Sequence, residues 1–140
     1  MFKIKNVMTT NVIAVKVDTS LSDVIRMLIE HNITGMPVVD DHMRLVGIIS
    51  EKNVMKMLNS SEYYNSAKVQ DFMTTDVVSF DIEDSLVDVC NCLINNHFRR
   101  VPILSNGNLV GIISRKNIIN SIFDYQGFFR DVPNECPVKA

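Results

Sequence analysis

The sequence predicts a mixed α/β (α+β) fold, made of two tandem β-α-β-β-α units that are related by a pseudo-twofold axis. Three observations predict it. The segment Met8–Leu58 recurs as Met73–Ile122, which indicates one supersecondary unit used twice. In each repeat a short β-rich run precedes an apolar pattern with helical period. Two apolar runs separated by a short polar turn then follow, and their closeness predicts a hairpin.

The repeat sets the predicted domain organisation. Leu45–Ser50 returns intact as Leu109–Ser114, so the two units align closely. We expect one pair of units over 1–123, with the first over about 6–58, a polar linker over 59–70, the second over about 71–123 and a tail over 124–140. The tail has no clear period, and its Phe128 and Phe129 are candidates for docking on a surface.

Composition limits the class of protein. The chain has 140 residues, 46% of them hydrophobic, and a formal charge of −2, which argues against a globally basic nucleic-acid binder. No apolar run approaches the roughly 20 residues that span a bilayer, and Met1–Lys5 lacks the apolar core of a signal peptide. We therefore expect a cytoplasmic protein without a membrane or nucleic-acid partner. Cys90, Cys92 and Cys136 form no disulfide framework, which fits a reducing compartment.

The first half of each unit is predicted as a strand and a helix. Val12–Val17 and Val77–Ile82 are β-rich runs. Ser20 and Ser85 are placed to cap the helices that follow, because a serine oxygen accepts hydrogen bonds from free N–H groups of the first turn. Each helix is expected to bury one apolar stripe. The stripes are Leu21, Val24, Ile25, Leu28 and Ile29, and Leu86, Val89, Cys90, Leu93 and Ile94.

The second half of each unit is predicted as a hairpin and a second helix. The strands Met36–Val39 and Val101–Leu104 contain a proline near their start, where the missing N–H donor is tolerated. Leu45–Ile49 and Leu109–Ile113 complete the hairpins. Ser50 and Ser114 then begin helices whose apolar faces would carry Val54, Met55 and Leu58, or Ile118, Ile119 and Ile122.

In both halves, the order of strand, helix, Pro-containing strand, Gly-Ile-Ile-Ser strand end and helix resembles the CBS motif. Two such motifs form a CBS pair, or Bateman module, and the resemblance covers about Asn6–Phe123. It implies a regulatory module that binds adenosine compounds (AMP, ADP, ATP or S-adenosylmethionine) between the motifs and assembles as a homodimer. With no enzyme domain attached, a stand-alone pair would act through a regulated partner protein or simply hold a ligand.

The resemblance also assigns two clefts. The first is expected to use Arg99, Arg100, Ile113, Ser114 and Asn117, with Thr9, Thr10 and Ala14 as its other wall. The second is expected to use Thr34, Gly35, Ile49, Ser50 and Asn53, with Thr74, Thr75 and Ser79 opposite. Phosphate is bound by hydroxyls, helix N-terminal N–H groups and arginine, which Ser114 and Arg100 provide. Since Gly35 stands where the second repeat has Arg100, the Arg-bearing cleft should prefer anions.

One departure from the family pattern concerns Asn53 and Asn117. Nucleotide-binding members typically carry an aspartate there, which accepts hydrogen bonds from both ribose hydroxyls. Loss of a hydrogen bond to a charged group lowers affinity about 10- to 150-fold. Asparagine therefore either weakens a nucleotide site or favours a different ligand.

Structural interpretations of the same residues stay open. Ser50 and Ser114 are also plain helix caps, the two asparagines can close those caps, Arg99 and Arg100 can be a surface pair, and the threonines can shape turns. We expect Cys90 to be a small buried hydrophobe, and we expect no metal site, since the histidines and cysteines have no ligand spacing. No catalytic constellation is present, so the chain is predicted not to be an enzyme. The alternative to a ligand sensor is a ligand-free interaction or scaffold protein.

Overall fold

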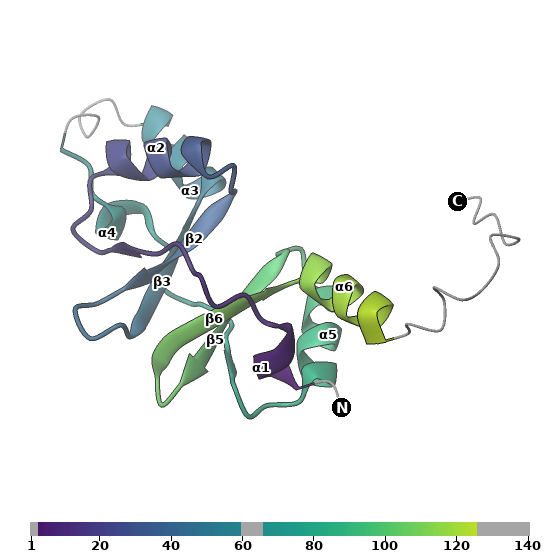
Figure 1. The fold of residues 1–140 in the computed structure, drawn as a ribbon. Coiled ribbons are helices and arrows are strands. Elements are labelled where there is room, and N and C mark those ends of the chain that lie inside the picture. The colour runs from purple at the N-terminus through teal and green to yellow at the C-terminus, as the bar shows by residue number, and fades with distance from the viewer. Residues whose placement is uncertain (1–2, 60–65, 126–140) are drawn as a thin grey trace, which may run out of the picture.

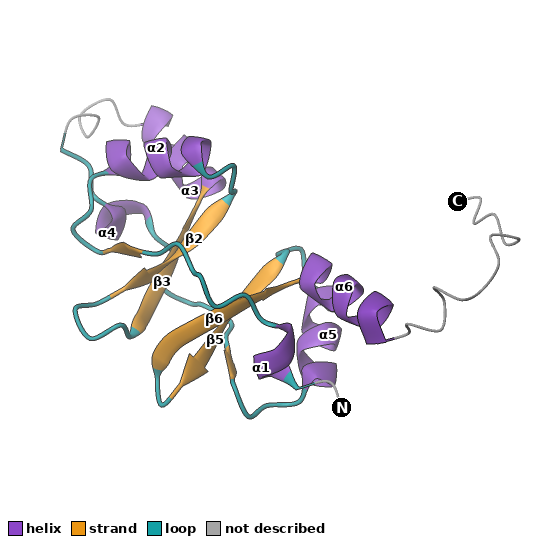
Figure 2. Ribbon diagram, viewed as in Figure 1, coloured by secondary structure: helices purple, strands orange, loops and turns teal. Residues whose placement is uncertain are grey.

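A computed structural model describes residues 3–59 and 66–125, which form two lobes (Figure 1). Each lobe contains one three-stranded sheet with helices packed against it (Figure 2). The first sheet comprises β1 (Val15–Lys16), β2 (Gly35–Val39) and β3 (Leu45–Ser50). The second comprises β4 (Phe80–Asp81), β5 (Arg100–Ser105) and β6 (Asn108–Ser114). The helices are α1 (Ile4–Val7), α2 (Leu21–Glu30), α3 (Glu51–Met55), α4 (Val69–Phe72), α5 (Leu86–Asn95) and α6 (Arg115–Tyr125), with a 3-10 turn at Lys56–Asn59.

The element order confirms the predicted fold class. In each sheet the central strand pairs in parallel with the strand before the helix and antiparallel with its hairpin partner. Ser20 caps α2 by accepting a hydrogen bond from the Asp23 N–H at 3.2 Å, and Ser85 caps α5 through the Val87 N–H at 3.2 Å. The first strands are shorter than the predicted runs Val12–Val17 and Val77–Ile82. Their early residues belong instead to connections that cross between the lobes.

The buried stripes of α2 and α5 are narrower than the sequence suggests. Leu21, Val24 and Leu28 are buried, but Ile29 is 74% exposed. At 100° per residue, Ile29 lies about 80° around the helix from Leu21, beyond the face that a three-stranded sheet covers. Ile94 of α5 is 75% exposed for the same reason. The prediction that these two isoleucines are buried was therefore wrong.

The second helices differ from prediction in the same way. Four residues placed on their apolar faces are exposed in the single chain, namely Met55, Leu58, Ile119 and Ile122. Only Val54 and Ile118 pack against the two cores, as partly buried residues. Both lobes thus present apolar side chains on their outer helices.

The two cores are completed by exchanged segments, which the repeat does not reveal. Ile4 and Val7 of α1 precede the recurring segment Met8–Leu58, yet they belong to the second core, which also contains Leu86 and Val101. Val69 of α4 precedes the second repeat and packs in the first core. Figure 1 shows the N-terminal chain leaving α1 beside α5 and α6 and crossing to the other lobe. Each lobe therefore needs the other repeat's leading segment.

Backbone hydrogen bonds fix the two crossings. Thr9 and Ile112 exchange bonds of 2.8 and 3.0 Å, and Thr74 and Ile48 exchange bonds of 2.9 Å in both directions. The connection runs so close to β3 that a Cβ on Gly47 would lie 2.8 Å from the Thr74 carbonyl oxygen. A glycine within this strand is thus explained by the close approach of another backbone. The end of the linker, expected to be a polar connection, includes the buried Ala67 and the first two residues of α4.

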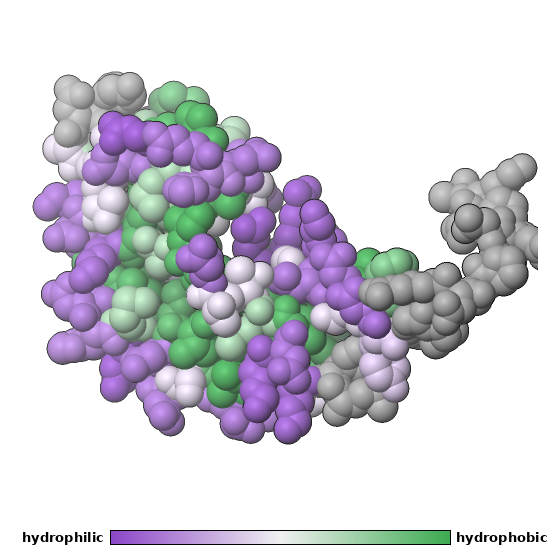
Figure 3. All heavy atoms as spheres, in the orientation of Figure 1, coloured by the Kyte–Doolittle hydropathy of each residue, from purple (hydrophilic) through white to green (hydrophobic). Residues whose placement is uncertain are grey.

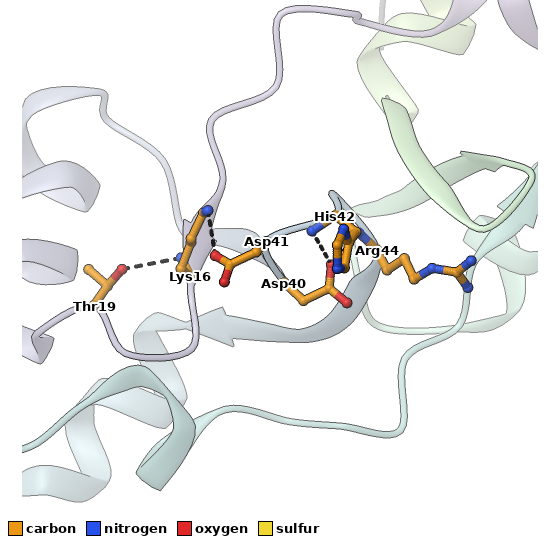
Figure 4. A network of polar contacts seen from close by, with 6 residues as sticks. All are labelled: Lys16, Thr19, Asp40, Asp41, His42 and Arg44. Atoms are coloured by element: carbon orange, nitrogen blue, oxygen red, sulfur yellow. Dashed lines mark hydrogen bonds and ion pairs between the residues drawn. The ribbon is translucent and has the colours of Figure 1, made fainter.

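The turn of the first hairpin is held by its own carboxylates (Figure 4). Asp40 Oδ1 accepts hydrogen bonds from the His42 N–H at 2.8 Å and from the Arg44 N–H at 2.9 Å. The bond from the Arg44 N–H is the main cause that holds the pKa of Asp40 below its usual value. Lys16 pairs with Asp41 at 2.8 Å on the exposed side of the turn. The turn also meets the second hairpin, because the Leu109 N–H donates to the Met43 carbonyl at 2.9 Å.

Candidate functional site

A cavity of about 230 Å³ lies where the N-terminal connection crosses the second motif. We call it the smaller cavity. It is lined by Thr9, Asn11, Val12, Ile13, Ile33, Gly35, Arg100, Ile112, Ser114 and Asn117. Residues before β1 and at the start of β2 supply one wall, while β5, β6 and the start of α6 supply the other. The cavity therefore joins both motifs, with an apolar slot beside a group of polar side chains.

At the start of α6, Ser114 and Asn117 form a closed hydrogen-bonded pair. Asn117 Oδ1 accepts from the Ser114 N–H at 2.9 Å and from the Ser114 hydroxyl at 3.0 Å. The Asn117 backbone N–H donates to Ser114 Oγ at 3.1 Å. Asn117 Nδ2 then donates to Thr9 Oγ1 at 3.2 Å, across 108 residues of sequence. Asn117 thus closes the cap that Ser114 forms at the start of α6, and it also links the two motifs.

The first motif repeats this arrangement at the start of α3. Asn53 Oδ1 accepts from the Ser50 N–H at 2.9 Å and from its hydroxyl at 2.8 Å. Asn53 Nδ2 donates to Thr74 Oγ1 at 3.2 Å. Asn53 is only 6% exposed, whereas Asn117 is half-buried. Of the two pairs, the one at Asn117 is the more open to a ligand.

A larger cavity of about 500 Å³ adjoins the smaller one and shares Gly35, Arg100 and Ile112 with it. Its remaining lining residues are Thr34, Met36, Pro37, Ile48, Ser50, Glu51, Lys52, His97, Phe98, Arg99 and Pro102. Three cations stand against one carboxylate in this lining. Over residues 3–59 and 66–125 the two ion pairs found are Lys16–Asp41 and Arg26–Asp23, so none of these cations is neutralised by a carboxylate there. The larger cavity is therefore suited to an anion.

The structure brings four of the eight residues expected in the first cleft together at the smaller cavity, namely Thr9, Arg100, Ser114 and Asn117. Arg99 lines the larger cavity instead. Thr10 and Ala14 line neither cavity. The side chain of Ile113 is fully buried in the second core, and Ile112 lines both cavities in its place.

The second cleft is assembled less completely. Thr34, Gly35 and Ser50 line the larger cavity. Asn53 and Thr74 are bonded to each other beside it, while Thr75 and Ser79 line neither cavity. The side chain of Ile49 is fully buried in the first core, and the larger cavity is lined by Ile48 instead. The opposing wall comes from His97–Arg100 rather than from the Thr74–Ser79 segment.

Sequence reasoning did not apply the strand register, and it missed several lining residues, Ile33 and Phe98 among them. Successive side chains of a strand face opposite sides, so the residue two before Ser114 shares its face. That rule selects Ile112 and, in the first motif, Ile48. Ile33 and its counterpart Phe98 also line the cavities, and their apolar character just before the second strand was the available signal.

The chain belongs to the CBS-domain family. The family model matches residues 4–60 and 69–124, which cover both repeats. An uncharacterised 17.7 kDa protein of Acidianus ambivalens is 31% identical over 87% of this chain, which spans 74% of that protein. The chloroplastic CBS domain-containing protein CBSX2 of Arabidopsis thaliana is 27% identical over 79% of this chain, which spans 58% of its length.

Solved structures agree in fold. A crystal structure of CBSX2 in complex with AMP has a TM-score of 0.79 and 29% identity, covering 90% of this chain and 99% of that one. A putative acetoin utilization protein from Vibrio cholerae has a TM-score of 0.83 at 21% identity, covering 94% of this chain and 97% of its own, and shows the shared fold. The two three-stranded sheets and their helices therefore match CBS-pair structures.

Other expected features concern metals and membranes. In the part of the chain that the structure describes, no three potential ligands of the His, Cys, Asp or Glu type come close enough to hold a metal ion. None of the described helices is long and apolar enough to cross a bilayer. Burial raises the pKa of the Cys90 thiol, as the apolar surroundings of a core position would. Cys136, Phe128 and Phe129 lie outside the described residues.

Proposed function

We propose that the chain is a regulatory CBS-pair module that binds an adenosine-type ligand in the cleft between its motifs and signals through a partner protein. One observation carries the proposal. The smaller cavity has apolar walls from both motifs, and Arg100 and the start of α6 line the same cavity. The AMP complex of the related CBSX2 supports this choice of ligand class.

The chemistry of the lining suits such a ligand. Val12, Ile13 and Ile112 offer an apolar slot of the kind that binds a purine base. Arg100 lies where this slot meets the larger cavity, and a guanidinium binds phosphate with two parallel hydrogen bonds. A nucleotide with its base in the smaller cavity would direct its phosphate towards Arg99 and Lys52. Arg100 is the residue on which we expect affinity to depend most.

Signalling would follow from the shared walls. A ligand shifts a conformational equilibrium only if it binds two geometries with different affinities. Because the walls of the smaller cavity belong to different motifs, a ligand that bridges them favours one relative placement of the lobes. A partner that contacts both lobes would sense that placement.

We further propose that the module is a cytoplasmic homodimer. Ile29, Met55 and Leu58 are 74%, 65% and 81% exposed on the outer helices of the first lobe. Ile94 and Ile119 repeat the pattern on the second lobe. Figure 3 shows hydrophobic atoms at the surface over the α2–α3 end of the molecule. Sedimentation of the wild type and of an Ile29→Lys variant would test this, since a monomeric wild type would contradict it.

Calorimetric titration with AMP, ADP, ATP, S-adenosylmethionine and NAD tests the ligand proposal. We expect micromolar binding of at least one ligand and at least tenfold weaker binding by Arg100→Ala. The matched control is Arg26→Ala, because Arg26 pairs with Asp23 on α2 and lines neither cavity. Unchanged affinity in Arg100→Ala would contradict the proposed site.

A ligand-free scaffold is the second candidate. The specific observation in its favour is that Asn53 donates to Thr74 and Asn117 donates to Thr9, so both amides are used in hydrogen bonds between the motifs. The outer helices also expose apolar side chains that a partner could cover. Absence of binding to all five ligands by a folded protein would favour this candidate over the sensor.

A further inference from the structure

The hydrogen bonds of Asn117 determine which atoms it can offer to a ligand. An amide can be placed with its oxygen and nitrogen exchanged, but a backbone N–H can only donate. The Ser114 N–H lies 2.9 Å from one terminal atom of Asn117, so that atom is the oxygen. The other terminal atom, 3.2 Å from Thr9 Oγ1, is therefore the NH2 group.

The oxygen of Asn117 has no capacity left for a ligand. It has two lone pairs, and it accepts both the N–H and the hydroxyl of Ser114. Ser114 Oγ accepts the Asn117 N–H and donates to the amide oxygen, so it keeps only one lone pair of an uncharged hydroxyl. What remains at this pair is the second N–H of the Asn117 amide, which is a donor, and the one uncharged lone pair of Ser114 Oγ.

The rest of the lining does not supply a strong acceptor. The polar side chains of the smaller cavity are Thr9, Asn11, Arg100, Ser114 and Asn117, and none is a carboxylate. Arg100 has donors only. Asn11 is exposed and carries no charge, so its amide oxygen offers a ligand no more than water does. A ribose diol, which is held best by a carboxylate that accepts from both hydroxyls, meets no such group here.

We infer that this cavity recognises the base and the anionic group of its ligand but not the ribose diol, so that ribonucleotides and 2′-deoxyribonucleotides bind with similar affinity. Asn117 is the residue that determines this lack of sugar specificity. The inference deepens the proposed function and rests on it. It also assigns the second Nδ2 proton of Asn117 to an acceptor of the ligand, such as a sugar ring oxygen or a phosphate oxygen.

The test compares AMP with 2′-deoxy-AMP by calorimetry on the wild type and on Asn117→Asp. Aspartate keeps the cap, since one carboxylate oxygen accepts both Ser114 bonds and the Thr9 hydroxyl is free to donate to the other. That second oxygen gives the diol the acceptor that asparagine denies it. AMP and 2′-deoxy-AMP carry the same charge, so any repulsion from the new carboxylate cancels in the ratio of their affinities.

We expect the wild type to bind the two nucleotides within about threefold of each other. In Asn117→Asp the preference for AMP should rise to about 10- to 150-fold, the range for a hydrogen bond to a charged group. Asn53→Asp is the matched control, because Asn53 makes the same bonds in the other motif but lines neither cavity. Its preference should stay at the wild-type value. Circular dichroism would confirm that all three proteins are folded.

Failure of this inference and failure of the proposed function give different results. A wild type that binds AMP at least tenfold more tightly than 2′-deoxy-AMP would overturn the inference while the proposed function stands. So would an Asn117→Asp variant whose preference is unchanged, or an Asn53→Asp variant that gains the same preference. Failure of the folded wild type to bind either nucleotide would overturn the proposed function and, with it, the inference.

Discussion

Replacing Asn53 with alanine should remove both the cap at the start of α3 and a side-chain hydrogen bond between the motifs. The buried amide makes three hydrogen bonds, at 2.8 and 2.9 Å to Ser50 and at 3.2 Å to Thr74. Each neutral hydrogen bond contributes a net of about 0.5–1.5 kcal/mol, and a lost cap alone costs about 1 kcal/mol. We therefore expect the free energy of unfolding to fall by about 2–4 kcal/mol. For a domain of this size that lowers Tm by about 8–16 °C.

The assay is thermal and urea unfolding of Asn53→Ala, Thr74→Val and the double variant. Thr74→Val removes only the bond between the motifs and keeps the shape of the side chain, so it should cost about 0.5–1.5 kcal/mol. The double variant should be less destabilised than the sum of the single variants by about 1 kcal/mol, because both remove the same bond. A Tm change below about 3 °C in Asn53→Ala, or strictly additive costs, would refute the reasoning.

Three further perturbations follow from the fold. Ile4→Ala should cost about 2–5 kcal/mol in unfolding experiments, and hydrogen exchange should show the loss in β4–β6 rather than in β1–β3, because α1 packs in the second core. Gly47→Ala should lower the free energy of unfolding by about 1–3 kcal/mol, because the new Cβ would lie 2.8 Å from the Thr74 carbonyl oxygen. Gly111→Ala should lower it less, because the nearest atom to its new Cβ belongs to the flexible Met8 side chain. Equal melting temperatures of the two variants would contradict this. The hydrogen bond from the Arg44 N–H lowers the pKa of Asp40, so its stabilising effect is present above about pH 3.8 and is lost as the pH falls through the lowered pKa. Asp40→Asn accepts the same bonds without titrating, so the gap in Tm between wild type and variant should narrow between pH 7 and pH 2, and a constant gap would rule the effect out.

Local sequence signals predicted most of the elements. The caps Ser20 and Ser85, the Pro-containing central strands and the hairpins depend on contacts within a few residues, and the structure contains each of them. The exposure of Ile29 was not predictable from helical period alone. The helical period shows which side of a helix is apolar. The width of the helix face that becomes buried depends on the size of the sheet it packs against. The predicted boundaries of the two units and the linker remain predictions.

Some of the residues predicted for the site lie together in the structure. Arg100, Ser114 and Asn117 come together with Thr9 as expected, because a repeat fixes which strand ends and helix starts correspond. The side chain of Ile113 is buried in the second core, and alternation along the strand selects Ile112 for the cavity wall instead. The paired roles of Asn53 and Asn117 were open between cap and ligand contact, and only the distances show that the amide oxygen is fully used by the cap. Contact of these residues with a ligand stays a prediction.

The sequence by itself determined the doubled unit, its order of strands and helices, and the difference between Gly35 and Arg100. These follow from identities along one chain and from local hydrogen-bonding rules. Only the tertiary structure decided that α1 completes the second core and α4 the first, and that Arg100 lies on the boundary of two adjoining cavities. The physical reason is that both depend on where the connections cross. A crossing is fixed by backbone bonds such as Thr9–Ile112, between residues too far apart in sequence for any local pattern to record.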